Sequence, residues 1–239
     1  MWFEQCLCLS VLGLIASAVA FGENLDPADD PKNIKRPCPN FDLNCIREYF
    51  SRNSQCQLVM GSVPDPLPLN YYRVDIPNSN LTVEYHDVKT RGFDTIKIIE
   101  FYINSKTEKL VLAAEVQSLK LASPKTIFKY NRKAKEPIVR SDALEVDYGT
   151  LTFTAVFPSI SDLQLSNAEV FSYVHEINPK FILGPLLSFS LDSETQSQLG
   201  KLLNNIAVSL QEVFEAQGTI LMTSYIQYDI CDFGLELAS

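Results

Sequence analysis

The chain has 239 residues and a formal net charge of −9, and its sequence pI is near 4.8. An acidic chain is a poor candidate for nucleic-acid binding, because that binding depends on neutralising phosphates. With 46% hydrophobic and 10% aromatic residues, the composition is that of a globular protein and excludes a disordered or repetitive one.

Residues 1–20 have the character of a secretory signal peptide, although Glu4 stands where Lys or Arg is usual. The run 6–18 is mostly apolar and ends in small residues, so we expect cleavage after Ala20 or after Ala18. A membrane-spanning helix needs about 20 apolar residues, which neither this run nor any later segment supplies. The sequence therefore predicts a secreted protein without a membrane anchor.

Residues 21–40 form a polar lead-in, which we expect to be extended or partly disordered. A short helix should follow, with Asp42 as its cap. Its apolar residues have the spacing of one helix face: Ile46, Tyr49 and Phe50. A proline-rich segment, 64–68, then separates this helix from the next element. We expect residues 41–239 to form a single domain.

From residue 70 to about 191, apolar and polar side chains alternate as they do in β-strands. Within 96–103 and within 110–121, the parity of the apolar positions changes midway. Because side chains alternate with a period of two, such a change indicates a bulge, and bulges bend and twist a sheet. A turn at 104–106 separates the two runs, as in a hairpin. The pattern predicts long, strongly curved antiparallel strands.

The last part of the chain has helical periodicity and predicts one long amphipathic helix from about Thr195 to Tyr228. Such a helix would span roughly 50 Å, and we expect it to kink at Gly218. A long helix after a curved sheet indicates that the sheet wraps the helix. The predicted fold class is α+β: a long C-terminal helix wrapped by a strongly curved antiparallel β-sheet, with a short disulfide-tied N-terminal helix.

Four cysteines follow the leader, Cys38, Cys45, Cys56 and Cys231, and they allow three pairings. A helix over 42–55 would separate Cys45 from Cys56 by about 16 Å. A disulfide needs Cα atoms within about 7 Å, so Cys45–Cys56 is not expected. Cys38 lies in the lead-in and can fold back on Cys45, so Cys38–Cys45 and Cys56–Cys231 are favoured. In the alternative, one cysteine stays free or bonds another chain. A zinc site is not expected, since closely paired cysteines and histidine partners are both lacking.

No motif indicates catalysis. The two histidines, His86 and His175, each lie in a strand-like run beside a carboxylate, which is an ordinary surface pattern. The chain has no nucleophile elbow and no zinc-protease, Walker or dinucleotide-binding motif. The sequence therefore predicts a protein that is not an enzyme and that uses no cofactor or metal.

Two surface features can be located from the sequence. Asn80-Leu81-Thr82 is an N-glycosylation sequon just after a turn, and we expect a glycan on Asn80. A basic run, 129–140, stands out in the acidic chain. It is either the solvated tip of a hairpin or a contact for an acidic partner, since opposite charges steer association.

Several short motifs lie around the cysteines and along the chain: Arg36-Pro37-Cys38-Pro39, Cys45-Ile46-Arg47, Asn53-Ser54-Gln55-Cys56, Val63-Pro64-Asp65-Pro66, Arg91-Gly92-Phe93-Asp94, Phe101-Tyr102-Ile103-Asn104, 132–138 and Cys231-Asp232-Phe233-Gly234. Together they resemble the fibrohexamerin family, the small glycoprotein subunits of lepidopteran silk fibroin. The resemblance implies association with fibroin heavy and light chains, without catalysis, during assembly of secretory complexes in the silk gland. A single sequon departs from the several that are typical of that family.

More broadly, the chain resembles the juvenile-hormone-binding and takeout-like secreted proteins, in which a curved sheet wraps a long helix around an apolar tunnel. Two functions follow as expectations. In the first, the protein binds fibroin chains non-covalently in the silk gland lumen and the silk fibre. In the second, it carries a small apolar, lipid-like ligand such as a juvenile hormone or a fatty acid. The alternative to a tunnel is that the apolar residues fill the core solidly.

Overall fold

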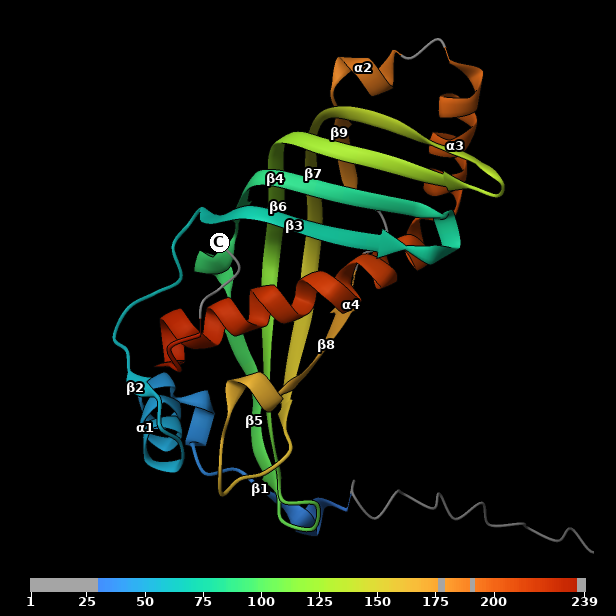
Figure 1. The fold of residues 1–239 in the computed structure, drawn as a ribbon. Coiled ribbons are helices and arrows are strands. Elements are labelled where there is room, and N and C mark those ends of the chain that lie inside the picture. The colour runs from blue at the N-terminus through green and yellow to red at the C-terminus, as the bar shows by residue number, and fades with distance from the viewer. Residues whose placement is uncertain (1–29, 176–178, 190–191, 236–239) are drawn as a thin grey trace, which may run out of the picture.

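The computed structural model describes residues 30–175, 179–189 and 192–235. Among these residues, eight strands form one antiparallel sheet, whose long central strands β6 and β7 run the length of the molecule (Figure 1). The strands are β1 (Ile34–Lys35), β3 (Leu67–Ile76), β4 (Leu81–Arg91), β5 (Lys97–Asn104), β6 (Lys109–Arg132), β7 (Lys135–Phe157), β8 (Glu169–Val174) and β9 (Lys180–Leu183). A separate pair joins β2 (Gln57–Leu58) to β10 (Cys231–Asp232).

The sheet has two halves that share the β6–β7 hairpin. In the first half, β5 lies beside the start of β6, and β8 lies beside the end of β7. In the second half, β4 and β9 take the corresponding places, with β3 beyond β4. The β6–β7 hairpin therefore pairs with other strands in both halves of the sheet.

Both predicted bulges are present. The register of β5 shifts between Ile98 and Glu100, and that of β6 shifts between Val116 and Leu119. The shift in β6 keeps its apolar side chains buried on both sides of the bulge, as these residues show: Leu112, Ala114, Val116, Leu119 and Leu121. The bulges allow long strands to curve without exposing their apolar side.

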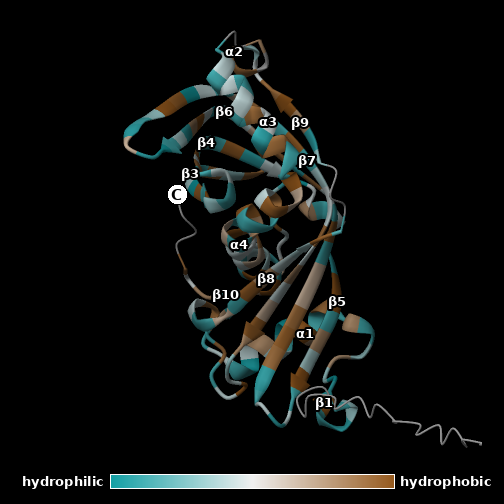
Figure 2. Ribbon diagram, turned by 90° about the vertical axis from the view of Figure 1, so that its right-hand side faces the viewer, coloured by the Kyte–Doolittle hydropathy of each residue, from teal (hydrophilic) through white to brown (hydrophobic). Residues whose placement is uncertain are grey.

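The concave face of the sheet holds α4 (Ile206–Tyr225), which packs against β3, β7 and β8. Figure 2 shows strands on more than one side of this helix. Its buried residues include Leu210, Val213, Phe214 and Leu221. The expected fold class, a helix wrapped by a curved antiparallel sheet, is confirmed.

The single helix predicted over 195–228 is wrong in two respects. It is divided at Asn205 into α3 (Ser193–Asn204) and α4, because Asn205 leaves the helical region at φ −109° and ψ 26°. After α4, the chain makes one π-helical turn, Ile226–Ile230. Gly218, where a kink was expected, lies inside the uninterrupted helix α4.

Gly218 instead permits close contact between the helix and the sheet. A Cβ atom on this residue would lie 1.8 Å from Ser172 Oγ on β8. An alanine at this position would require the Ser172 side chain to move, so the glycine allows the two elements to approach closely.

The N-terminal helix α1 (Leu43–Asn53) begins where predicted: Asp42 accepts a hydrogen bond from the Cys45 N–H at 2.7 Å. Disulfides join Cys38 to Cys45 and Cys56 to Cys231, each with Cα atoms 5.6 Å apart. This is the pairing that the helix geometry favoured. The second bridge lies beside the β2–β10 pair and ties the two ends of the chain together.

Part of the predicted lead-in belongs to the sheet, because β1 pairs with β5. The leader, its cleavage sites at Ala18 and Ala20, and residues 21–29 lie outside the described residues. In the described part of the chain, no helix has the length and apolar character required to cross a membrane.

Candidate functional site

A cavity of about 110 Å³ lies at the second half of the sheet, between the concave face and the helices. One wall comes from β4 and β7, with Leu81, Val83 and Leu144. The opposite wall comes from α3 and α4, with Leu202 and Leu210. The lining is predominantly apolar, as in sites for small organic ligands. The apolar residues of this region therefore do not fill the core solidly.

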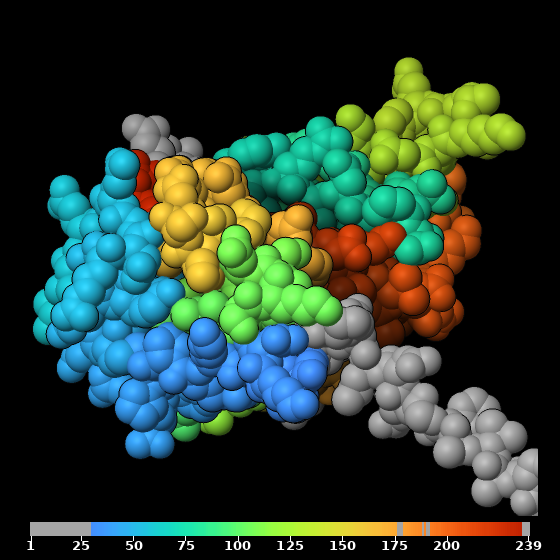
Figure 3. Space-filling view, turned by 90° about the horizontal axis from the view of Figure 1, so that it is seen from below, coloured from blue at the N-terminus to red at the C-terminus, as the bar shows by residue number. Residues whose placement is uncertain are grey.

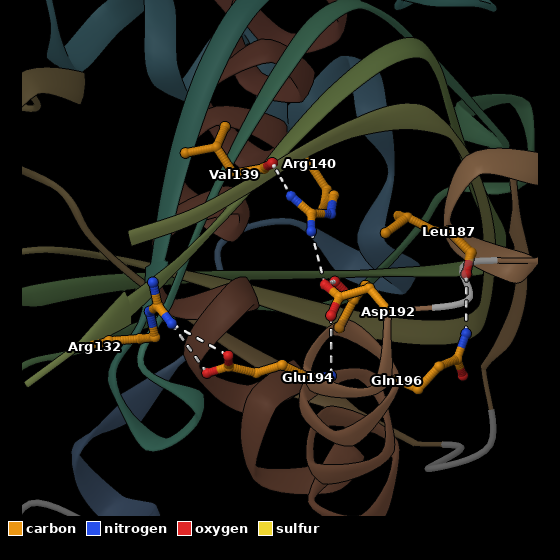
Figure 4. Close-up of polar contacts among 8 residues, drawn as sticks. Arg132, Val139, Arg140, Leu187, Asp192, Glu194 and Gln196 are labelled. Atoms are coloured by element: carbon orange, nitrogen blue, oxygen red, sulfur yellow. Dashed lines mark hydrogen bonds and ion pairs between the residues drawn. The ribbon is translucent and has the colours of Figure 1, made fainter. Parts of the chain in front are cut away.

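The cavity is covered by α2 (Pro185–Ser188) and by the start of α3. Leu187 of α2 lines the cavity, and its N–H donates to Asp142 Oδ2 at 2.8 Å. The Gln196 side chain donates to the Leu187 carbonyl at 3.4 Å (Figure 4). Gly184 directly precedes α2, and a Cβ there would overlap the Asp142 carboxylate. One hydrogen bond to a buried carboxylate and one from Gln196 thus help to hold this cover in place.

Two ion pairs join the β6–β7 hairpin to the start of α3 (Figure 4). Arg132 lies 3.2 Å from Glu194, and Arg140 lies 2.7 Å from Asp192. Hydrogen bonds from Thr195 and then from Arg140 lower the pKa of the Asp192 carboxyl below its usual range. We call these two pairs the latch, because they connect two walls of the cavity.

The polar groups of the cavity wall are mostly paired. Ser79 and Ser209 form a hydrogen bond at 3.0 Å, and Thr195 donates to Asp192. Burial raises the pKa of Tyr85 and of Tyr148, which keeps both hydroxyls neutral.

Gln198 of α3 is different from these paired groups. Its Oε1 atom is buried and has no hydrogen-bond partner among the described residues. An unpaired buried acceptor is costly to the folded state.

The basic run 129–140 forms the tip of the β6–β7 hairpin, which projects from the body as the lime-green segment in Figure 3. Its place at a hairpin tip agrees with the first expectation, and a contact with an acidic partner stays a prediction. Lys133 and Lys135 are exposed, whereas Arg132 and Arg140 contact acidic residues of the same chain. The sequence signal located the basic residues but not their partners on α3, which lie 62 and 52 positions away.

Asn80, the sequon residue, is exposed and has a left-handed conformation at φ 47°. It ends the short turn Pro77–Ser79, just before β4. A side chain that points to solvent from a turn leaves room for a glycan.

The two histidines have separate surroundings. His86 lies on β4, with its ring 5.2 Å from that of Tyr71. His175 follows β8 and hydrogen-bonds to Thr152 Oγ1 at 2.7 Å. In the ranges that the structure describes, no group of three or more His, Cys, Asp or Glu side chains could hold a metal ion. That the protein is not an enzyme stays a prediction.

Two of the motifs quoted above meet in space. Gly92 has φ 107°, and a Cβ there would overlap the Ser118 carbonyl at the bulge of β6. The Gly92 N–H donates to Asp65 Oδ2 at 2.9 Å. The segments 63–66 and 91–94 therefore meet beside the bulge of β6.

Residues 34–235 match the family model described as Fibroin P25. The chain is 27% identical to Fibrohexamerin of Galleria mellonella over 210 residues, covering 87% of this chain and 93% of that protein. Among solved structures, Epiphyas postvittana Takeout 1 matches 76% of this chain and 92% of its own, at 14% identity. The TM-score of this match is 0.38. The matched segment spans most of the sequence, and the chain belongs to the fibroin P25 family.

Proposed function

We propose that the protein is a secreted, non-catalytic silk fibroin subunit that binds fibroin heavy and light chains non-covalently and aids their assembly and secretion. The observation that carries this proposal is the family match over residues 34–235. The relative that shares 27% identity is itself named Fibrohexamerin. The silk gland lumen and the silk fibre are the corresponding proposed locations.

The cysteine arrangement supports a non-covalent mode of association. Among the described residues, all four cysteines are used in disulfides within the chain, Cys38–Cys45 and Cys56–Cys231. This leaves no thiol in that part of the chain for a bridge to a fibroin chain. We propose the same connectivity for the secreted protein, and peptide mapping without reduction would establish it.

The test is reconstitution with purified fibroin heavy–light dimers. We expect the secreted protein to co-elute with the dimer in size-exclusion chromatography, and to be released by mild denaturant without a reducing agent. Failure to co-elute would contradict the proposal, as would a disulfide-linked band on a non-reducing gel. Treatment with an N-glycosidase should shift the mass of the protein, and Asn80→Gln should abolish that shift.

A second function, the carriage of a small apolar ligand, is favoured by the cavity. The cavity lies beneath α2 and α3 and has predominantly apolar walls. We propose that it holds a lipid-like molecule. Native mass spectrometry of protein purified from its secretion should detect a bound lipid. Absence of any bound lipid, together with no uptake of apolar probes, would exclude this function without affecting the first.

A further inference from the structure

One edge of the sheet is open along β8. This strand pairs with β7 on one side and, within the residues that the structure describes, with no strand on the other (Figure 1). The His175 N–H donates to the Thr150 carbonyl at 3.1 Å, which fixes the residues of β8 whose main-chain groups face β7. Because this direction alternates along a strand, the N–H and C=O groups of Val170, Ser172 and Val174 face the open edge. No hydrogen-bond partner for these groups lies among the described residues.

Two other edge strands of the sheet carry features that discourage the addition of a strand. β3 contains Pro68, and its exposed residues include the charged Arg73 and Asp75. β9 has only four residues and begins with Lys180. Prolines, charges and short length are the usual protection of an edge strand. Residues 170–174 of β8 include neither a charge nor a proline, so this edge lacks that protection.

The exposed face of β8 is aromatic. Phe171 is 57% exposed and Tyr173 is 63% exposed. Ser172, which lies between them, faces Gly218 of α4, so the two rings point away from the helix. β8 is thus held by β7 at one edge and by α4 on one face before any partner binds. A strand that is ordered in advance loses less conformational entropy when it binds.

From these observations we infer that β8 is a docking edge, to which an extended, uncharged segment of a fibroin chain adds as a further strand. Main-chain hydrogen bonds to Val170, Ser172 and Val174 would supply affinity for an extended segment. Phe171 and Tyr173 would favour apolar side chains at the positions opposite them. The inference rests on the fibroin association proposed above and names the surface that mediates it.

Hydrogen exchange with residue-level detection tests the pairing, on the full secreted chain alone and bound to purified fibroin heavy–light dimers. The N–H groups of Val170, Ser172 and Val174 should exchange rapidly in the free chain and become protected in the complex. Those of Phe171 and Tyr173 face β7, so they should be protected in both states. A complex without new protection at the first three positions would overturn the inference and leave the proposed function intact. If no complex forms, the proposed function fails as well.

A pair of matched substitutions tests the surface. Tyr173→Lys places a charge on the open edge strand and should weaken binding to the heavy–light dimer by about tenfold, as measured by biolayer interferometry. Tyr71→Lys is the control, because Tyr71 is a 42% exposed tyrosine on the edge strand β3, and its affinity should stay unchanged. An equal loss of affinity in the control would overturn the inference.

Sedimentation of the free chain tests whether a second copy occupies the edge instead. We expect the unmodified protein and Tyr173→Lys to sediment alike. A dimer of the unmodified protein that Tyr173→Lys dissociates would show that β8 pairs with itself, and this result would overturn the inference.

Discussion

The two ends of the molecule differ in how they are filled and fastened. At the closed end, formed by α1, β5 and β10, aromatic rings pack on one another. Phe50 is 0% exposed, and its ring centroid lies 5.3 Å from that of Phe157 and 6.2 Å from that of Phe101. At the cavity end, formed by β4, β9, α2 and α3, the same curved sheet leaves a hollow.

The closed end and the cavity end also differ in the bonds that hold them together. The closed end has both disulfides and a buried ion pair, in which Arg47 Nη2 lies 3.3 Å from Asp229 Oδ1. The cavity end has the latch, whose side chains are partly exposed. Exposed ion pairs contribute little to stability, whereas disulfides across long loops contribute much. The comparison predicts that the cavity end opens more readily than the closed end.

The largest effect should come from the long disulfide. Replacing Cys56 and Cys231 together by Ser removes a bridge between residues 175 positions apart. The chain-entropy relation predicts a loss of about 5 kcal/mol in the free energy of unfolding, against about 2.5 kcal/mol for the double replacement of Cys38 and Cys45. Urea denaturation measures both losses. Equal losses would contradict the expected dependence of the stabilisation on loop length.

Two leucine-to-alanine substitutions, one at each end of the molecule, test whether the closed end is more tightly packed than the cavity end. Leu112 at the closed end is 0% exposed, and Leu210 at the cavity is 3% exposed. We expect Leu112→Ala to cost about 4 kcal/mol and Leu210→Ala about 2 kcal/mol, because a side chain beside a cavity loses fewer contacts. Urea denaturation again gives the values. Only Leu210→Ala should alter the affinity for apolar probes, and an equal stability cost at the two sites would contradict the comparison.

The contact between α4 and β8 is tested by Gly218→Ala. The added Cβ would overlap Ser172 Oγ, so we expect a loss of about 1–3 kcal/mol in the free energy of unfolding. The double variant with Ser172→Gly should recover much of that loss. Gly200 of α3 is the control: a Cβ there meets nothing within 4 Å, and Gly200→Ala should stabilise the protein by about 0.5–1 kcal/mol. Thermal denaturation of the variants measures these changes. Stabilisation by Gly218→Ala would contradict a close approach of α4 to β8.

Breaking the latch should have the smallest effect on stability. Its effect should appear instead in the rate at which the cavity takes up a small molecule. Interactions with Thr195 and Arg140 lower the pKa of Asp192, so its contribution is present above the ordinary pKa near 3.8 and is lost as pH falls through the lowered value. We expect Arg132→Gln to speed the uptake of a small apolar fluorescent dye by the cavity. High salt should speed the same uptake in the unmodified protein, because it screens the ion pairs. Stopped-flow fluorescence measures the rate.

Arg73→Gln is the control for the latch, because it breaks an exposed pair with Asp75 that does not line the cavity. Its dye uptake should remain unchanged. An equal acceleration in Arg73→Gln would mean that the latch does not control entry.

Local chemistry determined much of this fold in advance. The alternation of side chains predicted the strands, and the changes of parity predicted the bulges in β5 and β6. The cap at Asp42 followed from residue type alone, and the favoured cysteine pairs followed from the rise of a helix. These features depend on residues close together in the chain, so a single sequence contains the information.

Only the tertiary structure decided where segments distant in sequence meet. The break at Asn205, the role of Gly218, the latch and the unpaired Gln198 were not readable from the sequence. Each depends on the curvature of the whole sheet, which brings α3 to the β6–β7 hairpin and α4 to β8. Periodicity predicts which face of a strand or helix is buried. The cavity exists because the side chains of the sheet and of α3 and α4 do not fill the space between them.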